Sequence, residues 1–168
     1  EKDYIMRYCF DIETDGFLDT ATKVHCIILK DIDTNKILHL NNEEAVKKLE
    51  QAELIIGHNI IKFDIPVLEK FYNFKSNAKV FDTIVATRLL FPDIKDRDFK
   101  HKNFPKDCIG RHSLKAWGNR VCEYKEQFDT DWKEFSVGML EYCIQDVQVT
   151  HTLFNMIEKK GYSQQAMD

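Results

Sequence analysis

The order of the apolar segments is the feature that most restricts the fold of this 168-residue chain. Two stretches rich in β-branched and aromatic residues, 5–12 and 24–32, are followed by a shorter one at 36–40. The polar turn at 33–35 predicts that the second and third stretches form a β-hairpin. A chain that begins in this way must bury one face of a sheet, and helices further along the chain can cover it.

Helical and strand patterns alternate after the hairpin. Asn41 and Asn42 can cap a helix, and Pro66 is acceptable only in the first turn of one. The charged segment 92–111 contains two prolines, and we expect it to be the one long loop. The other expected elements are a helix after Asn42, a strand at 54–59, a helix at 63–72, a strand end and helix within 80–91 that begins at Asp82, and helices at 113–121 and 136–160. This order predicts an α/β domain with a mixed sheet flanked by helices.

The size and the composition indicate one globular domain. Hydrophobic residues make up 43% of the chain and charged residues 31%, which is typical of a soluble globular protein. We expect residues 1–168 to form a single domain, in which Met6 is a possible native start, residues 1–5 lie outside the native sequence, and residues 161–168 are a frayed tail.

Several function classes are disfavoured. No apolar run approaches the roughly 20 residues that span a membrane, and no basic and apolar leader opens the chain. Five cysteines without a C-x-x-C pair indicate reduced thiols, and so a cytoplasmic location. The net charge of −4 argues against non-specific coating of nucleic acid, although a local basic groove remains compatible with it.

Four acidic residues stand at the ends or edges of apolar segments. Asp11 and Glu13 are two positions apart in a predicted strand, so their side chains lie on the same side. Asp64 follows the buried stretch at 54–59, near the start of a helix, and Asp146 stands on the last helix four residues after Tyr142. Each acid taken alone could be a solvated strand end, a helix cap or a surface pair.

Together the four acids predict a metal site. Carboxylates at this density repel one another unless cations lie between them. Clusters of oxygen ligands favour Mg²⁺ or Mn²⁺, and the histidines and cysteines show no zinc-ligand spacing.

The order and spacing of these motifs resemble a known family. Asp11-x-Glu13, then Asn59 to Asp64, then Tyr142-x-x-x-Asp146 resemble the three motifs of the DEDD 3′–5′ exonucleases, tyrosine subtype. The stretches GHNIIKFD, FDTIVATRLLF and GRHSLKAWGNRVCEYKEQF look like the proofreading domain of T-seven-type bacteriophage family A DNA polymerases. The resemblance implies a ribonuclease H-like fold with a mixed five-stranded sheet. The polymerase domain of that family is absent, so both a stand-alone exonuclease and an excised domain remain open.

The resemblance also implies a mechanism. Two divalent cations, Mg²⁺ or Mn²⁺, would promote hydrolysis of the terminal phosphodiester and release nucleoside 5′-monophosphates from a 3′ end. Asp11 would bridge both ions, Glu13 and Asp146 would complete one ion site, and Asp64 would hold the other ion largely through water. Tyr142 would orient the attacking water, since a phenol with an unperturbed pKa near 10 is a poor base at neutral pH.

Further positions match family residues that meet the substrate. The resemblance implies that Thr14 and Phe17 contact the terminal nucleotide, with Phe17 as an apolar wedge, and that Asn59 and Phe63 touch the penultimate sugar-phosphate. Alternatively, these are turn, strand-end and core residues. Asp82 is expected to cap a helix. A basic stripe that could follow the strand comprises Arg111, His112, Lys115 and Arg120, although part of it must be the solvated face of a packed helix.

The leading hypothesis is therefore a metal-dependent 3′–5′ DNA exonuclease of the proofreading type. Its expected partners are the 3′ end of single-stranded DNA and a polymerase domain in cis or in trans, with no membrane. A 3′–5′ exoribonuclease is the alternative enzyme, because sugar preference depends on contacts to the 2′ position. A non-catalytic module that only holds single strands is the alternative from another class.

Overall fold

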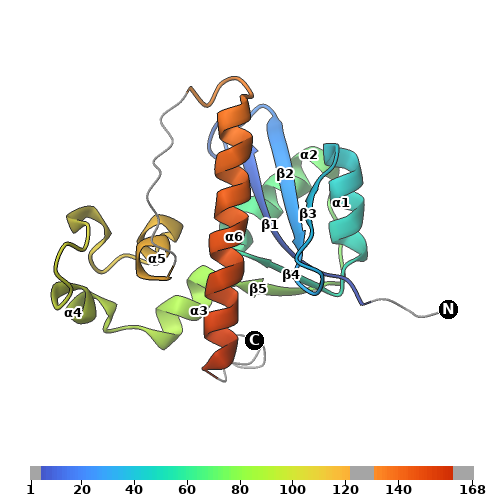
Figure 1. Cartoon of the computed structure of the whole chain (residues 1–168). Helices are drawn as coiled ribbons and strands as arrows, with labels where there is room; N and C mark the ends of the chain where they lie inside the picture. The colour runs from blue at the N-terminus through green and yellow to red at the C-terminus, as the bar shows by residue number, and fades with distance from the viewer. Residues whose placement is uncertain (1–4, 122–130, 161–168) are drawn as a thin grey trace.

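The computed structural model describes residues 5–121 and 131–160. A five-stranded sheet with strand order β3-β2-β1-β4-β5 forms its centre, with helices on both sides (Figure 1). The strands are β1 (Arg7–Thr14), β2 (Val24–Asp31), β3 (Ile37–His39), β4 (Leu54–Gly57) and β5 (Lys79–Asp82). The helices are α1 (Asn42–Gln51), the π-helical turn η1 (Ile60–Asp64), α2 (Ile65–Tyr72), α3 (Thr83–Leu90), α4 (Ile94–Phe99), the 3-10 turn η2 (Lys106–Cys108), α5 (Leu114–Val121) and α6 (Val137–Lys159).

The sheet is mixed, as the order of segments predicts. β1 pairs with β2 and β2 with β3 in antiparallel fashion, which confirms the hairpin around residues 33–35. β1 pairs with β4 and β4 with β5 in parallel, as expected where a helix intervenes between strands. The predicted α/β class with a mixed five-stranded sheet flanked by helices is therefore confirmed.

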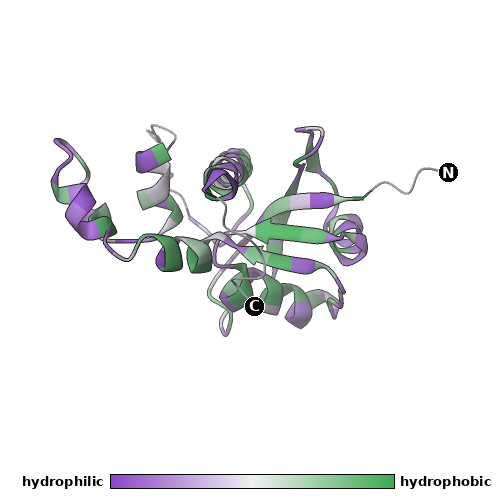
Figure 2. Cartoon of the chain, turned by 90° about the horizontal axis from the view of Figure 1, so that it is seen from below, coloured by the Kyte–Doolittle hydropathy of each residue, from purple (hydrophilic) through white to green (hydrophobic). Residues whose placement is uncertain are grey.

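Two apolar clusters cover the two faces of the sheet. On one face, Phe10, Ile55 and other strand residues pack with α1 and α2. On the opposite face, Ile28 and Ile56 pack with α3, α5 and α6. The green strands at the centre of Figure 2 show this apolar interior. At about 25 cal/mol for each square ångström of apolar surface removed from water, these clusters supply the main stabilisation of the fold.

Caps define several helix ends, as the sequence predicts. The Asn41 side chain accepts a hydrogen bond from the Glu44 amide at 2.9 Å, and Asp82 caps α3 by accepting from the Ile84 amide at 3.1 Å. Ser136 caps α6 in the same way, by accepting from the Met139 amide. These bonds satisfy amide groups that have no partner within the helix.

Three expected boundaries differ in the structure. β1 extends beyond residue 12 to Thr14, because pairing with β2 continues through Glu13 to a register shift between Glu13 and Thr14. β4 ends at Gly57 rather than at residue 59. The expected helix at 63–72 is divided, since residues 60–64 form a π-helical turn and α2 begins only at Ile65.

The expectation of one long loop at 92–111 was wrong. This segment contains α4 and the turn η2, because buried residues lie among its charged ones. Ile94 and Cys108 are buried, and the Asp98 carboxylate accepts two hydrogen bonds from Arg120 of α5. Internal contacts of this kind give a charged segment a defined structure. The frayed tail expected at 161–168 lies outside the described residues, as do residues 1–4.

Candidate active site

β1 carries the first two acids of the candidate site. Asp11 and Glu13 are half-buried and alternate with the buried residues Ile12 and Thr14, so their side chains leave the same side of the strand. Ligand atoms of Asp11, Glu13 and Cys143 all lie within 4.8 Å of one another. The Cys143 thiol is 3.5 Å from the Asp11 carbonyl oxygen and 3.6 Å from its Oδ2.

The segment after β4 places the third acid. Asn59 adopts a left-handed conformation, with φ 64° and ψ 30°, and the π-helical turn that follows ends at Asp64. Asp82 braces this segment, because its Oδ1 accepts from the Asn59 amide at 2.8 Å and its Oδ2 from the Ile61 amide at 3.1 Å. The expected structural role of Asp82 as a cap is thus extended to the turn that orients Asp64.

α6 carries the fourth acid and the tyrosine. Cys143, Val147, Phe154 and Ile157 of this helix are buried against the sheet. Asp146 is 9% exposed and lies at the edge of this buried face. Tyr142 stands one helical turn before Asp146, and its ring packs edge-on against Trp132, with ring centroids 5.8 Å apart.

The four acids form one electrostatic group. Burial raises the pKa of all four carboxyls above their ordinary values. The nearby Asp11 charge raises the pKa of Glu13, Asp64 and Asp146 further. As a result, the pKa of Asp11 is raised to about 6 and that of Asp146 to about 9. Without a counter-charge, this group retains protons in a pH range where exposed carboxyls are ionised.

These residues fit a divalent cation. Asp64 is 3% exposed, and its Oδ2 is the one buried side-chain oxygen or nitrogen in the described part of the chain that has no hydrogen-bond partner. An orphaned carboxylate oxygen near the Asp11 carboxyl is costly unless a cation lies close to it. Oxygen donors of this kind suit Mg²⁺ or Mn²⁺, whereas zinc sites favour imidazole and thiolate ligands.

An apolar cavity of about 430 Å³ lies beside Glu13. Its lining includes three of the residues for which sequence predicted a substrate-binding role, Thr14, Phe17 and Phe63. The Phe17 ring is 79% exposed, as an aromatic side chain that meets a ligand would be. Asn59 and Arg111 do not line this cavity: Asn59 lies in the braced turn before η1, and Arg111 is exposed ahead of α5.

Sequence reasoning missed Trp132. This residue lines the same cavity as Phe17, its ring packs against that of Tyr142, and its carbonyl oxygen lies 2.7 Å from Nε2 of His25 on β2. The available signal was a tryptophan in the polar segment ten residues before Tyr142. A single aromatic residue outside any periodic pattern gives no indication of which surface it faces.

Most residues of the predicted basic stripe make contacts within the protein. Arg120 pairs with Asp98 at 2.7 Å, Lys115 pairs with Asp107 at 2.6 Å, and the His112 carbonyl oxygen lies 2.7 Å from Nε2 of His58. Only Arg111 of this set is fully exposed.

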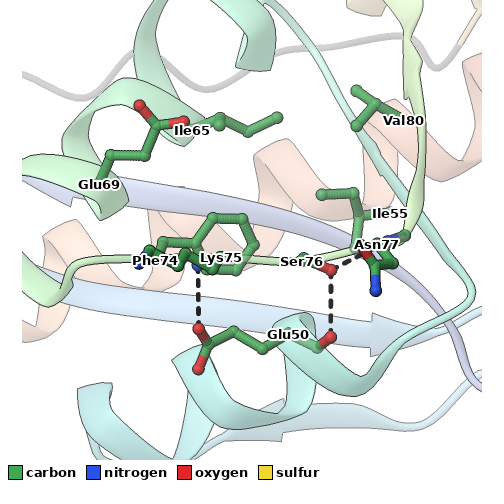
Figure 3. A pocket seen from close by; sticks show the side chains of 10 residues that line it. Glu50, Ile55, Ile65, Glu69, Phe74, Lys75, Ser76, Asn77 and Val80 are labelled. Carbon is green, nitrogen blue, oxygen red and sulfur yellow. Dashed lines mark hydrogen bonds between the residues drawn. The ribbon is translucent and has the colours of Figure 1, made fainter.

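Another cavity, of about 440 Å³, lies away from the acids (Figure 3). The loop after α2 closes one side of it, since the Lys75 amide donates to the Glu50 carboxylate at 3.0 Å and the Ser76 hydroxyl to the Glu50 carbonyl oxygen at 3.1 Å. Glu50 and Glu69 are its acidic residues, and neither belongs to a group with metal-binding geometry in the described ranges. The four-acid cluster is therefore the better candidate for chemistry.

The fold and the acid cluster define a nuclease domain of the ribonuclease H-like exonuclease type. Over residues 8–158 the sequence matches the RNase_H superfamily, and the chain belongs to this family. The DNA-directed DNA polymerase of Escherichia phage T7 is 28% identical over 187 residues, which cover 90% of this chain and 27% of the polymerase. The chain thus spans 27% of the length of this curated relative. The expected resemblance to the exonuclease part of T-seven-type polymerases is confirmed.

Solved structures share the fold at low sequence identity. Brucella melitensis NrnC with bound Mg²⁺ matches with a TM-score of 0.65 and 20% identity, over 96% of this chain and 78% of that one. Escherichia coli RNase D, described as an exoribonuclease involved in structured RNA processing, matches with a TM-score of 0.50 and 14% identity, over 94% of this chain and 41% of that one. Within the described residues, no helix has the length and apolar character needed to cross a membrane.

Proposed function

We propose that this chain is a metal-dependent 3′–5′ DNA exonuclease of the proofreading type, formed by a single domain that spans residues 1–168. The observation that carries the proposal is the convergence of four carboxyls, two buried and two half-buried, in which Asp11 repels the other three, with the orphaned Oδ2 of Asp64 among them. The site binds two Mg²⁺ or Mn²⁺ ions through Asp11, Glu13, Asp64 and Asp146. When bound, the ions supply an activated water and stabilise charge on the leaving oxygen.

The chain's own residues orient the reaction. Water attacks the terminal phosphorus, the bond from phosphorus to the 3′ oxygen breaks, and a nucleoside 5′-monophosphate leaves. Tyr142 positions the attacking water with its hydroxyl. Thr14 and Phe17 contact the terminal nucleotide at the cavity beside Glu13, which Phe63 also lines. Asn59 and Phe63 touch the penultimate sugar-phosphate, and Arg111 lies on the path of the strand.

DNA is the proposed substrate because the phage polymerase match covers 90% of this chain. In this reading the strand comes from a polymerase domain in cis or in trans, in the cytoplasm. An exoribonuclease is the second candidate, favoured by the shared fold with RNase D and NrnC. A module that binds single strands without cleaving them is the third, and the presence of all four acids argues against it.

The test compares 5′-labelled single-stranded DNA with RNA of the same sequence, in Mg²⁺, Mn²⁺ or EDTA. The expected result is a metal-dependent ladder that shortens from the 3′ end of DNA and disappears in Asp11→Ala/Glu13→Ala. The matched control is Glu53→Ala/Glu69→Ala, which removes two exposed acids outside the cluster. A ladder on RNA alone would select the exoribonuclease. Binding without any ladder would select the non-catalytic module.

A further inference from the structure

Most of the segment expected to be a loop, together with α5, forms a charged surface. Residues 94–121, which we name the basic arm, hold eight Lys or Arg and three Asp, a net charge of +5. The rest of the chain holds sixteen Lys or Arg and twenty-five Asp or Glu, a net charge of −9. Because the whole chain carries −4, this separation is hidden in its overall composition.

The basic arm has a defined internal structure. The Arg120 guanidinium donates to both carboxylate oxygens of Asp98, and the Gly110 amide donates to Asp98 Oδ2 at 2.9 Å. The same guanidinium lies 4.6 Å from the Trp117 ring centroid and 5.2 Å from that of Phe104. These contacts hold α4, the turn η2 and α5 together, so the charges of the arm have fixed positions.

The arm presents cations that the fold does not use. Its exposed basic residues without an ion pair in the described part of the chain are Lys95, Lys100, Lys102, Lys106 and Arg111. Phe99 on α4 is 65% exposed beside them. Lysines around an exposed aromatic ring form a surface suited to a single strand, whose phosphates pair with the cations and whose bases stack on the ring.

The arm is joined to the candidate active site. His58 follows β4 directly, next to Asn59, and its Nε2 lies 2.7 Å from the His112 carbonyl oxygen at the base of the arm. Its Nδ1 lies 2.7 Å from the Thr83 hydroxyl of α3. From this base, α4 extends away from the sheet beyond α3 and α5 (Figures 1 and 2). Arg111, next to His112 in the chain, therefore lies near the turn that ends at Asp64.

We propose that the basic arm binds the phosphates of the nucleic-acid strand on the 5′ side of the terminus held at the acids. This inference rests on the proposed function for the position of the 3′ end. Lys115 and Arg120 do not take part, because both are paired within the arm. The arm adds affinity that grows with strand length, whereas the cavity beside Glu13 accepts only the terminal nucleotide.

The test measures binding of fluorescent oligodeoxythymidylates in EDTA, so that no cleavage occurs. In Lys95→Gln/Lys100→Gln/Lys102→Gln/Lys106→Gln, we expect binding of an oligomer of about 20 nucleotides to weaken by about 10²- to 10³-fold at 0.1 M salt. The slope of log K against log salt should fall in magnitude by about 3, at roughly 0.7 per lost phosphate contact. The loss should shrink for an oligomer of about 4 nucleotides, which is too short to reach the outer lysines.

The matched control is Lys36→Gln/Lys47→Gln/Lys75→Gln/Lys79→Gln, which removes the same charge from exposed lysines outside the arm. Binding by the control variant that is as weak as that by the arm variant would overturn the inference. If the wild type cleaves DNA and the arm and control variants bind it equally well, the arm proposal fails and the exonuclease proposal stands. If the wild type does not cleave DNA but only the arm variant loses binding, the arm proposal stands and the exonuclease proposal fails.

Discussion

Arg120 and Asp98 form a buried ion pair in which both carboxylate oxygens accept from one guanidinium, at 3.0 Å from Nε and 2.7 Å from Nη2. Their side chains are only 10% and 4% exposed. The pKa of Asp98 is lowered, because hydrogen bonds from Arg120 and the Gly110 amide outweigh its burial. This pair joins α4 to α5 and is the main polar link within the basic arm.

Arg120→Ala should therefore destabilise the protein by about 3–5 kcal/mol, because it leaves the Asp98 carboxylate buried without its partner. Urea unfolding followed by circular dichroism measures this change. Arg97→Ala, which breaks an exposed pair with Asp93, is the control and should cost less than about 1 kcal/mol. Equal losses in the two variants would contradict the buried link.

Asp82→Ala should affect the site as well as stability. The carboxylate accepts from the Asn59, Ile61 and Ile84 amides, and so it holds the turn that ends at Asp64. Loss of three bonds to a buried carboxylate should cost about 2–4 kcal/mol. We expect calorimetry to show weaker Mn²⁺ binding as well. Asn41→Ala, which removes the cap of α1 and no contact of the acids, should lower stability by about 1 kcal/mol and leave Mn²⁺ binding unchanged.

The sequence predicted the sheet well because strand and helix periods are local signals. Caps such as Asn41 and Asp82 also depend on nearby residues alone. The arm was missed because its structure depends on Asp98 meeting Arg120, twenty-two residues away, and charge patterning gives no sign of such a contact. The four acids could be predicted as site residues from their positions at the ends or edges of apolar segments. Trp132 could not be predicted, since a single aromatic residue outside any periodic pattern gives no sign that it packs against Tyr142.

The acid cluster should make stability depend on pH in the absence of metal. Folding raises the pKa of these carboxyls, so the native state holds more protons than the unfolded chain above about pH 4. The free energy of unfolding therefore falls as the pH rises through the pKa values of the folded state, about 6 for Asp11 and about 9 for Asp146. We expect the melting temperature in EDTA to fall across this window and Mg²⁺ to restore it.

The matching variant is Asp11→Asn/Glu13→Gln, which should flatten the pH dependence and raise the melting temperature in EDTA. Glu53→Gln/Glu69→Gln, at exposed positions, should leave both as in the wild type. A wild-type profile that rises with pH in EDTA would refute mutual repulsion among the acids.

Tyr142→Phe should separate the hydroxyl from the ring. The ring still packs against Trp132, so the fold and Mn²⁺ affinity should be retained. If the hydroxyl orients the attacking water, kcat should fall by about 10- to 100-fold while KM stays near the wild-type value. Single-turnover cleavage of labelled DNA measures the chemical step directly. An unchanged rate would remove Tyr142 from the mechanism.

The cavity between Phe17 and Trp132 should decide how the terminal nucleotide is held. Phe17 is 79% exposed, so Phe17→Ala removes a ring that does little for the fold and should cost less than about 0.5 kcal/mol of stability. Loss of one stacked base should weaken binding of single-stranded DNA by about 1–3 kcal/mol and slow the removal of a paired 3′ nucleotide. Phe99→Ala on the arm, equally apolar and exposed, should spare removal of the paired nucleotide. If Phe17→Ala cleaves paired and unpaired termini as fast as the wild type, the ring does not act as a wedge.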